Sequence, residues 1–287
     1  MVPGVHEDRD IPCVLSIAGS DSGGGAGIQA DLKAFARCGV HGMTAVTAIT
    51  AQNTVGVDAV HQVPPEMIVA QVRAVARDIG IDAVKVGMLG AAPTATAVAH
   101  ALDELDPATP VVVDPVMVAE SGAILLEPEA RAVLVERVIP RATVVTPNLA
   151  EARALTGIDD EATPPADLAR AVHALGPRAV VVTGGHRAEA SDVFFDGETL
   201  ETITGERHPD GAAHGSGCTH SSVLASQLAL GATPLEAARV AKTLAAEAVR
   251  DGLRDVGAGP GPVDVLGLRR GAAGASRTER SGTNPLP

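Results

Sequence analysis

The chain has 287 residues and a formal net charge of −13, and it contains three Phe but no Tyr or Trp. So little aromatic surface excludes proteins that bind single-stranded nucleic acid by stacking the bases. The acidic balance also excludes a general attraction to nucleic acids or to anionic membranes. Because 46% of the residues are hydrophobic and 20% are charged, we expect a folded globular protein rather than a disordered chain.

The sequence gives no sign of membrane insertion or export. No apolar run reaches the roughly 18 residues that a membrane helix needs, and the N-terminal stretch MVPGVHEDRD lacks the apolar core of a secretory signal. The three cysteines, Cys13, Cys38 and Cys218, show no CxxC spacing, which argues against a disulfide framework or a cysteine zinc site. These features predict a cytoplasmic protein.

Short runs rich in Val and Ile alternate along the chain with segments of helical period. The predicted strands are residues 14–18, 43–51, 83–87, 111–114, 143–146 and 179–183. The predicted helices are residues 27–38, 65–79, 94–105, 128–138, 149–155, 166–175, 218–230 and 234–251. Several strands are apolar on both faces, as in a parallel sheet covered by helices. The alternation predicts a three-layer α/β/α sandwich with a mostly parallel central sheet, which binds ligands beyond the carboxyl ends of its strands.

Two stretches depart from this alternation. Residues 56–63 and 191–203 are predicted to be extended, and Asp196-Gly197 in the second is typical of a hairpin turn. The sequence after Leu268 is poor in apolar residues and rich in Gly, Ser and Arg, so we expect it to be disordered. The predicted organisation is an N-terminal extension at 1–12, a single domain at 13–268 and a tail at 269–287.

A glycine-rich segment, AGSDSGGGAGIQAD, spans residues 18–31 between a predicted strand and a predicted helix. Its glycines would let the backbone approach a ligand closely, although a plain tight turn is the alternative interpretation. No Gly-Lys-Ser/Thr follows, which argues against a Walker A loop. An acidic residue about 20 positions later is also missing, and Gln52 stands there instead, which argues against a dinucleotide site.

A second segment, HGSGCTH, spans residues 214–220 and opens a long apolar helix. The backbone N–H groups at a helix N-terminus form an anion-binding site. The same position is expected to lower the pKa of Cys218, and a thiolate beside bound anions can act as a base or nucleophile. The alternative interpretation is a glycine-rich helix start with a structural cysteine.

Two acidic residues follow successive predicted strands. Asp114 begins the sequence DPVM, and Glu151 ends TPNLAE. Carboxylates at this edge of a sheet suit Mg²⁺, although a turn residue and a helix-stabilising acid would explain them separately. The next strand ends in VVVTGGH at residues 180–186, where nucleotide phosphates or ribose can approach the backbone, or where the chain simply turns.

Several motifs occur together in a fixed order: AGSDSGGGAGIQADLKAF, TAITAQNTVGV, KVGML, DPVM, TPNLAEA, GGH and HGSGCTHSS. From about Val14 to about Leu266, the sequence resembles the hydroxymethylpyrimidine/phosphomethylpyrimidine kinases of thiamin biosynthesis, which are ribokinase-like. The resemblance implies transfer of phosphate from ATP to 4-amino-5-hydroxymethyl-2-methylpyrimidine, and then to its monophosphate, with Mg²⁺ as a cofactor. It also implies a possible homodimer with residues 56–63 at its edge.

The resemblance implies roles for the residues at matching positions. Cys218 matches the proposed catalytic base, and Gln52 matches the side chain that hydrogen-bonds the pyrimidine. The backbone of Gly215, Ser216 and Gly217 matches the anion hole. The other positions that match the pyrimidine pocket are Gly19, Ala26, Asp31, Met88 and Val116. ATP is expected at Asn148, Thr183 and Gly185, and Mg²⁺ at Asp114 and Glu151, where Asn148 and Glu151 form the family's N-x-x-E element.

Three positions depart from the family pattern. Thr183 and Glu120 stand where the family often has Lys, and residues 210–213 read DGAA where Asn-Thr is common. Each of the first two changes removes a cation near the phosphates. A non-catalytic pyrimidine- or nucleotide-binding protein is therefore one alternative. A pyridoxal kinase is the other alternative, but Gln52 favours an aminopyrimidine because an amide both donates and accepts hydrogen bonds.

Overall fold

The computed structural model describes residues 9–118, 122, 125–184, 190–209 and 211–269. The predictions for residues 1–8, Glu120, Gly185 and residues 270–287 lie outside these ranges. The described strands form one nine-stranded sheet in the order β3-β2-β1-β4-β5-β6-β7-β8-β9. Their bounds are β1 Cys13–Asp21, β2 His41–Gln52, β3 Val57–Gln62, β4 Ala83–Val86, β5 Val111–Val113, β6 Val144–Val145, β7 Ala179–Val182, β8 Asp192–Phe195 and β9 Leu200–Ile203.

The six strands from β2 to β7 in the sheet run parallel, while β3, β8 and β9 pair antiparallel at the two edges. In register, Ile17 faces Val86, Val86 faces Val113, and Val113 faces Val145. The carboxyl ends of these strands therefore lie at one edge of the sheet. The β8–β9 hairpin confirms the predicted turn, in which the Asp196 carboxylate accepts hydrogen bonds from the backbone of Glu198 and Thr199.

The described helices are α1 Gly27–Cys38, α2 Pro65–Asp78, α3 Ala92–Asp103, α4 Pro128–Val133, α5 Leu149–Thr156, α6 Pro165–His173, α7 Ser216–Ala229 and α8 Pro234–Arg250. The predicted helix at 128–138 is shorter as an α-helix, because a π-helical turn at Leu134–Val138 and a 3-10 turn at Ile139–Arg141 follow α4. Pro140 lies in the second turn, and its missing N–H prevents the α-helix from continuing.

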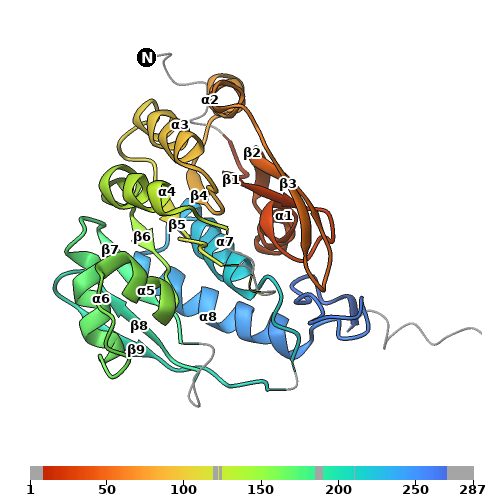
Figure 1. The fold of residues 1–287 in the computed structure, drawn as a ribbon, viewed down its shortest axis with the longest axis vertical. Helices are drawn as coiled ribbons and strands as arrows, with labels where there is room; N and C mark the ends of the chain where they lie inside the picture. Colours follow the sequence, from red (N-terminus) through yellow and green to blue (C-terminus); the bar gives the residue numbers. More distant parts are fainter. Residues whose placement is uncertain (1–8, 119–121, 123–124, 185–189, 210, 270–287) are drawn as a thin grey trace, which may run out of the picture.

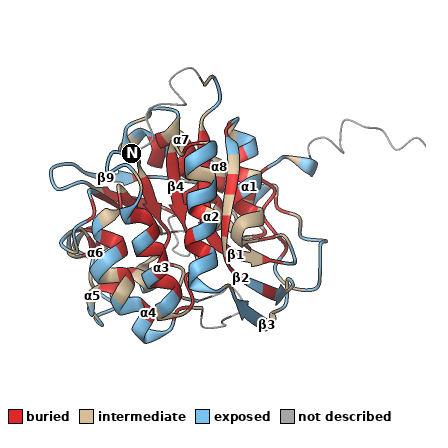
Figure 2. Ribbon diagram, turned by 90° about the horizontal axis from the view of Figure 1, so that it is seen from above, coloured by how far each residue is buried: buried red, intermediate tan, exposed pale blue. Residues whose placement is uncertain are grey.

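Helices cover both faces of the sheet, as the alternating sequence pattern predicts. α1, α7 and α8 pack on one face, and α2 to α6 pack on the other (Figure 1). Their inward faces are buried and their outward faces are exposed (Figure 2). These layers confirm the three-layer α/β/α fold. No helix in the described part of the chain is long and apolar enough to cross a membrane.

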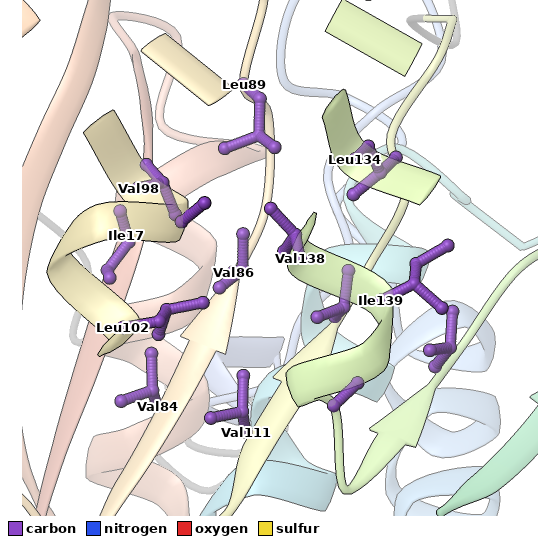
Figure 3. Packing of buried hydrophobic residues seen from close by; sticks show 14 of the residues in the cluster. Ile17, Val84, Val86, Leu89, Val98, Leu102, Val111, Leu134, Val138 and Ile139 are labelled. Carbon is purple, nitrogen blue, oxygen red and sulfur yellow. The ribbon is translucent and has the colours of Figure 1, made fainter. Parts of the chain in front are cut away.

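Aliphatic side chains form the core on the α2–α6 side. Val84 and Val86 of β4 pack there with Leu102 of α3 and Val138 (Figure 3). Because successive strand residues point to opposite faces, Lys85 between these two valines points toward α7. Lys85 has no exposed surface, so a charged side chain lies buried under the carboxyl edge of the sheet.

Candidate active site

A cavity of about 420 Å³ runs along the carboxyl edge of the parallel strands. Each parallel strand, or the segment just after it, contributes a lining residue: Gly19, Gln52, Met88, Asp114, Asn148 and Thr183. The first turn of α7 lines the same cavity with Gly215, Ser216, Gly217 and Cys218, and Ala26, Val116 and Glu151 complete the predicted set. The cavity therefore brings together the described residues that the sequence nominated, except Asp31.

The glycine-rich loop after β1 is held by a buried carboxylate. Asp21 accepts backbone hydrogen bonds from Gly23 at 2.8 Å, Gly25 at 3.0 Å and Ala26 at 2.8 Å. His214 Nε2 lies 3.2 Å from the same carboxylate. Burial raises the pKa of Asp21, but the hydrogen bonds from His214 and the backbone outweigh it and leave that pKa below its ordinary value. Asp21 therefore shapes this loop and ties it to the segment that opens α7.

The two glycine-rich segments are in backbone contact. A Cβ on Gly25 would lie 2.1 Å from His214 Cδ2, and a Cβ on Gly215 would lie 1.8 Å from the Gly25 carbonyl oxygen. Gly215 also has a φ of 84°, which favours glycine. Glycine is thus required at both positions for the substrate-side loop and the start of α7 to pack together.

Gln52 ends β2 and faces the cavity beside this loop. Ser22 Oγ donates to the Gln52 carbonyl oxygen at 2.6 Å, and the Gln52 N–H donates back to Ser22 Oγ at 2.8 Å. Thr50 Oγ1 donates its one proton to the Ser20 carbonyl oxygen at 2.9 Å and lies 3.2 Å from Gln52 Oε1. The two hydrogen bonds with Ser22 therefore fix the backbone of Gln52.

Cys218 is the third residue of α7 and is partly exposed in the cavity. Its environment raises the pKa of the thiol to about 12, chiefly through burial, with Lys85 opposing and the Asp31 and Asp114 carboxylates adding to the increase. The expectation of a lowered pKa is therefore wrong. The helix N-terminus lowers the pKa of the thiol, whereas burial beside two carboxylates raises it. The second effect is the larger one here.

Asp31 lies beneath the cavity rather than in its wall. Lys85 Nζ lies 2.9 and 3.0 Å from its two carboxylate oxygens. Ser16 and Ser222 donate to the same carboxylate at 2.6 and 2.7 Å. Burial lowers the pKa of Lys85, but Asp31, Cys218 and Asp114 outweigh it and hold that pKa above its ordinary value. Lys85 lines the cavity, and sequence reasoning missed it, although a lysine inside the apolar strand AVKV was a detectable signal.

Asp114 and Glu151 lie near the middle of the cavity wall. Ser221 Oγ donates to Asp114 Oδ2 at 3.0 Å, and Glu151 forms a capping box with Asn148 at the start of α5. Burial raises the pKa of Glu151 to about 8, and the charge of Asp114 adds to the increase. Burial also raises the pKa of Asp114, against the opposing charge of Lys85.

This pair fits a Mg²⁺ ion that also binds phosphates and water. No cluster of three or more His, Cys, Asp or Glu able to hold a metal occurs among the described residues. Mg²⁺ in kinases is commonly held by one or two carboxylates, with substrate phosphates and water completing its shell. Burial raises both pKa values, the charge of Asp114 adds to the increase at Glu151, and a bound cation would favour the ionised forms of both carboxylates.

A further charged cluster lines the end of the cavity formed by β7, β8 and α8. Lys242 Nζ lies 2.7 Å from Asp192 Oδ1, and the Gly184 N–H donates to the same oxygen at 3.1 Å. His220 Nε2 lies 3.4 Å from Asp192 Oδ2. Burial raises the pKa of Asp192, but His220 and Lys242 outweigh it and leave that pKa lowered. Sequence reasoning missed all three residues, which come from separate elements.

Comparison with known proteins identifies the family of this chain. The phosphomethylpyrimidine kinase family model matches residues 21–264. A hydroxymethylpyrimidine/phosphomethylpyrimidine kinase of Rhizobium meliloti is 48% identical over 254 residues, which cover 87% of this chain and 95% of that protein.

Solved structures show the same relationship. The phosphomethylpyrimidine kinase of Clostridium difficile has a TM-score of 0.72 and 40% identity, covering 80% of this chain and 96% of that one. An ADP complex of Bacillus subtilis pyridoxal kinase has a TM-score of 0.81 and 39% identity, covering 90% of this chain and 99% of that one. These matches confirm the resemblance in sequence, and the chain belongs to the phosphomethylpyrimidine kinase family.

Proposed function

We propose that this protein uses ATP to phosphorylate 4-amino-5-hydroxymethyl-2-methylpyrimidine and then its monophosphate, giving the diphosphate for thiamine biosynthesis. The observation that carries the proposal is the single cavity that joins Gln52, the first turn of α7 and the Asp114–Glu151 pair. An acceptor alcohol, the transferring phosphoryl group and a metal–nucleotide complex need these three kinds of group side by side. Membership of the family supports the same activity.

The pyrimidine occupies the end of the cavity near β1 and β2 in this proposal. The Gln52 amide both donates and accepts hydrogen bonds, which matches neighbouring donor and acceptor atoms on an aminopyrimidine. Ala26, Met88 and Val116 supply apolar or backbone contacts around the ring. Asp31 does not contact the pyrimidine in this proposal. It holds Lys85, which lines the cavity, through an ion pair whose two partners are fully buried.

The first turn of α7 faces the transferring group. The Ser216 N–H donates to the Ala213 carbonyl oxygen at 2.9 Å, so the N–H groups of Gly217 and Cys218 are the ones that stabilise the charge on the phosphoryl oxygens. The hydroxymethyl oxygen forms a bond to the γ-phosphorus while the bond to the β,γ-bridging oxygen breaks, and ADP leaves. We assign the hydroxymethyl proton to Cys218. With a thiol pKa of about 12, this role requires the minor thiolate form, so the first transfer is expected to accelerate with rising pH.

Mg²⁺ would be held by Asp114 and Glu151, where it would neutralise the nucleotide phosphates. The nucleotide lies toward β7 and α8, along Asn148, Thr183 and Lys242. Lys242 supplies a cation at this end of the cavity. Gly185, the remaining proposed ATP contact, lies outside the described residues.

Product analysis after incubation with the pyrimidine alcohol and Mg-ATP tests the proposal. Mono- and diphosphate products are expected, with ADP formed only when the pyrimidine is present. ADP formation independent of the pyrimidine, or no turnover at all, would contradict it, and absence of turnover would favour a non-catalytic binding protein.

Pyridoxal kinase activity is a second candidate, favoured by the likeness to the Bacillus subtilis pyridoxal kinase structure. Measuring kcat/KM for pyridoxal and for the pyrimidine alcohol under the same conditions distinguishes the two. A higher value for pyridoxal would overturn the assignment of the pyrimidine as the main substrate.

We also propose a homodimer formed through the β2–β3 edge of the sheet. β3 is an edge strand and is largely exposed (Figure 2). Ile49 and Val60 are 54% and 44% exposed on these strands, and Met67 of α2 is 53% exposed nearby. Light scattering coupled to size-exclusion chromatography gives the molar mass directly, and a monomer at micromolar concentration would refute the dimer.

A further inference from the structure

The segment after α8 crosses two loops of the active site without lining the cavity itself. We call residues 253–263 the C-terminal strap. Figure 1 shows the chain after α8 lying against the tip of the β2–β3 hairpin. The Gly259 N–H donates to Thr54 Oγ1 at 3.2 Å, linking residues 205 positions apart. A Cβ on Gly259 would lie 1.8 Å from the Thr54 carbonyl oxygen, so the two backbones are in direct contact.

The other end of the strap is fixed beside the start of α7. Val263 donates its N–H to the His214 carbonyl oxygen at 3.1 Å, and Leu253 donates to the Pro262 carbonyl oxygen at 2.8 Å, which closes the strap into a loop. The Pro262 side chain lies 3.2 Å from the Cβ position of Gly25. The strap therefore contacts the β2–β3 turn, the glycine-rich loop and the segment that opens α7.

Thr54 lies in the hydrogen-bonded turn that directly follows Gln52. The Asn53 side chain accepts hydrogen bonds from the backbone of Val55 at 2.8 Å and Gly56 at 3.1 Å, and the Asn53 N–H donates to the Gly56 carbonyl oxygen at 3.0 Å. These three hydrogen bonds form an Asx turn that joins residues 53–56 into one segment, which is covalently continuous with Gln52. A displacement of Thr54 would therefore be transmitted to Gln52, which Ser22 holds on its other side.

We propose that the C-terminal strap is a positioning element that fixes Gln52 relative to the first turn of α7. The proposal rests on the pyrimidine-binding role of Gln52 given above. Because phosphoryl transfer depends on placing the acceptor oxygen against the phosphoryl group, a small shift between these two elements reduces both acceptor affinity and the rate of transfer. Among the described residues, no hydrogen bond joins the strap to Asn148, Thr183 or Lys242, so KM for ATP is expected to change less than KM for the pyrimidine.

The test compares Thr54→Val with Thr54→Ser. Valine keeps the shape of threonine but removes the oxygen that accepts from Gly259, whereas serine keeps that oxygen. Loss of one such hydrogen bond is expected to raise KM for the pyrimidine about 3- to 10-fold with a smaller change in KM for ATP, and Thr54→Ser should stay near wild type. Gly259→Ala should have a larger effect of the same kind, because a Cβ there would lie 1.8 Å from the Thr54 carbonyl oxygen.

Amide hydrogen exchange provides a readout that does not depend on turnover. In Thr54→Val, exchange should accelerate at Gly259 and across residues 52–56 but not in α8. Equal rises in KM for ATP and for the pyrimidine, or unchanged exchange at these residues, would overturn the proposal. If the wild-type protein does not phosphorylate the pyrimidine, the proposed function fails, and the exchange measurement alone decides whether the strap holds the Gln52 turn.

Discussion

Replacing Glu151 with Gln tests whether the middle of the cavity holds excess negative charge. Burial and the Asp114 carboxylate raise the pKa of Glu151 from 4.5 to about 8. The folded protein therefore holds this proton more tightly than the unfolded chain does. The stability contributed by the protonated carboxyl is complete below about pH 4.5 and is lost as the pH rises through about 8. The wild-type free energy of unfolding is expected to fall over this range.

The pKa of Glu151 sets the size of the effect. At about 1.4 kcal/mol for each tenfold change in proton affinity, the ceiling is about 5 kcal/mol. Because Asp114 and Glu151 interact and share the titration, we expect roughly 2 kcal/mol from Glu151 alone. Glu151→Gln keeps an acceptor for the capping box but removes the charge at every pH. Its free energy of unfolding should therefore depend less on pH than that of the wild type.

Urea unfolding at pH 5, 6, 7 and 8 with a metal chelator measures the effect. Glu129→Gln is the control, because Glu129 is an exposed acid in the first turn of α4. The reasoning is refuted if wild type and Glu151→Gln lose stability in parallel between pH 5 and 8. Adding Mg-ATP should stabilise the wild type more at pH 8 than at pH 6, since the metal requires ionised carboxylates.

Three further substitutions test separate parts of the site. Lys85→Met leaves the buried Asp31 carboxylate without its partner, so the free energy of unfolding in urea should fall by about 3–5 kcal/mol. The double variant Lys85→Met/Asp31→Leu should recover most of this loss. No recovery would contradict the pairing. Cys218→Ala should slow the first transfer about 10²- to 10⁴-fold in single-turnover assays. The second transfer should slow less, since its acceptor oxygen is already ionised, and wild-type rates in both steps would refute the base assignment. Gln52→Ala should weaken pyrimidine binding more than ATP binding in calorimetry, and equal losses would argue against its role.

Local sequence patterns were sufficient to predict the layers of the fold and one side of the site. The helix predicted at 27–38 matches α1, and Asp114 lies just after β5, where the α/β alternation places ligand-binding residues. These predictions succeed because strand period, helix period and the carboxyl-edge rule depend on residues close together in the chain. Gln52 and Asn148 also line the cavity, but the family resemblance rather than a local pattern named them.

The parts that sequence reasoning missed depend on contacts between distant residues. Lys85 and Asp31 are 54 positions apart, and Lys242 and Asp192 are 50 apart. Neither pairing follows from the pattern around any one of these residues. The predicted direction of the Cys218 pKa shift is wrong for the same reason. The helix start is a local feature of the sequence, but burial beside two carboxylates arises only in the folded chain.

The cavity does not concentrate positive charge, although the proposed ligand is a polyphosphate. Lys85 and Lys242 line it together with Asp114, Glu151 and Asp192. Each lysine is paired with a buried carboxylate, Lys85 with Asp31 and Lys242 with Asp192. The proposed nucleotide therefore depends on the charge that Mg²⁺ would supply beside Asp114 and Glu151 and on the N-terminus of α7. Because Thr183 stands where the family often has Lys, the requirement for the metal is expected to be strict.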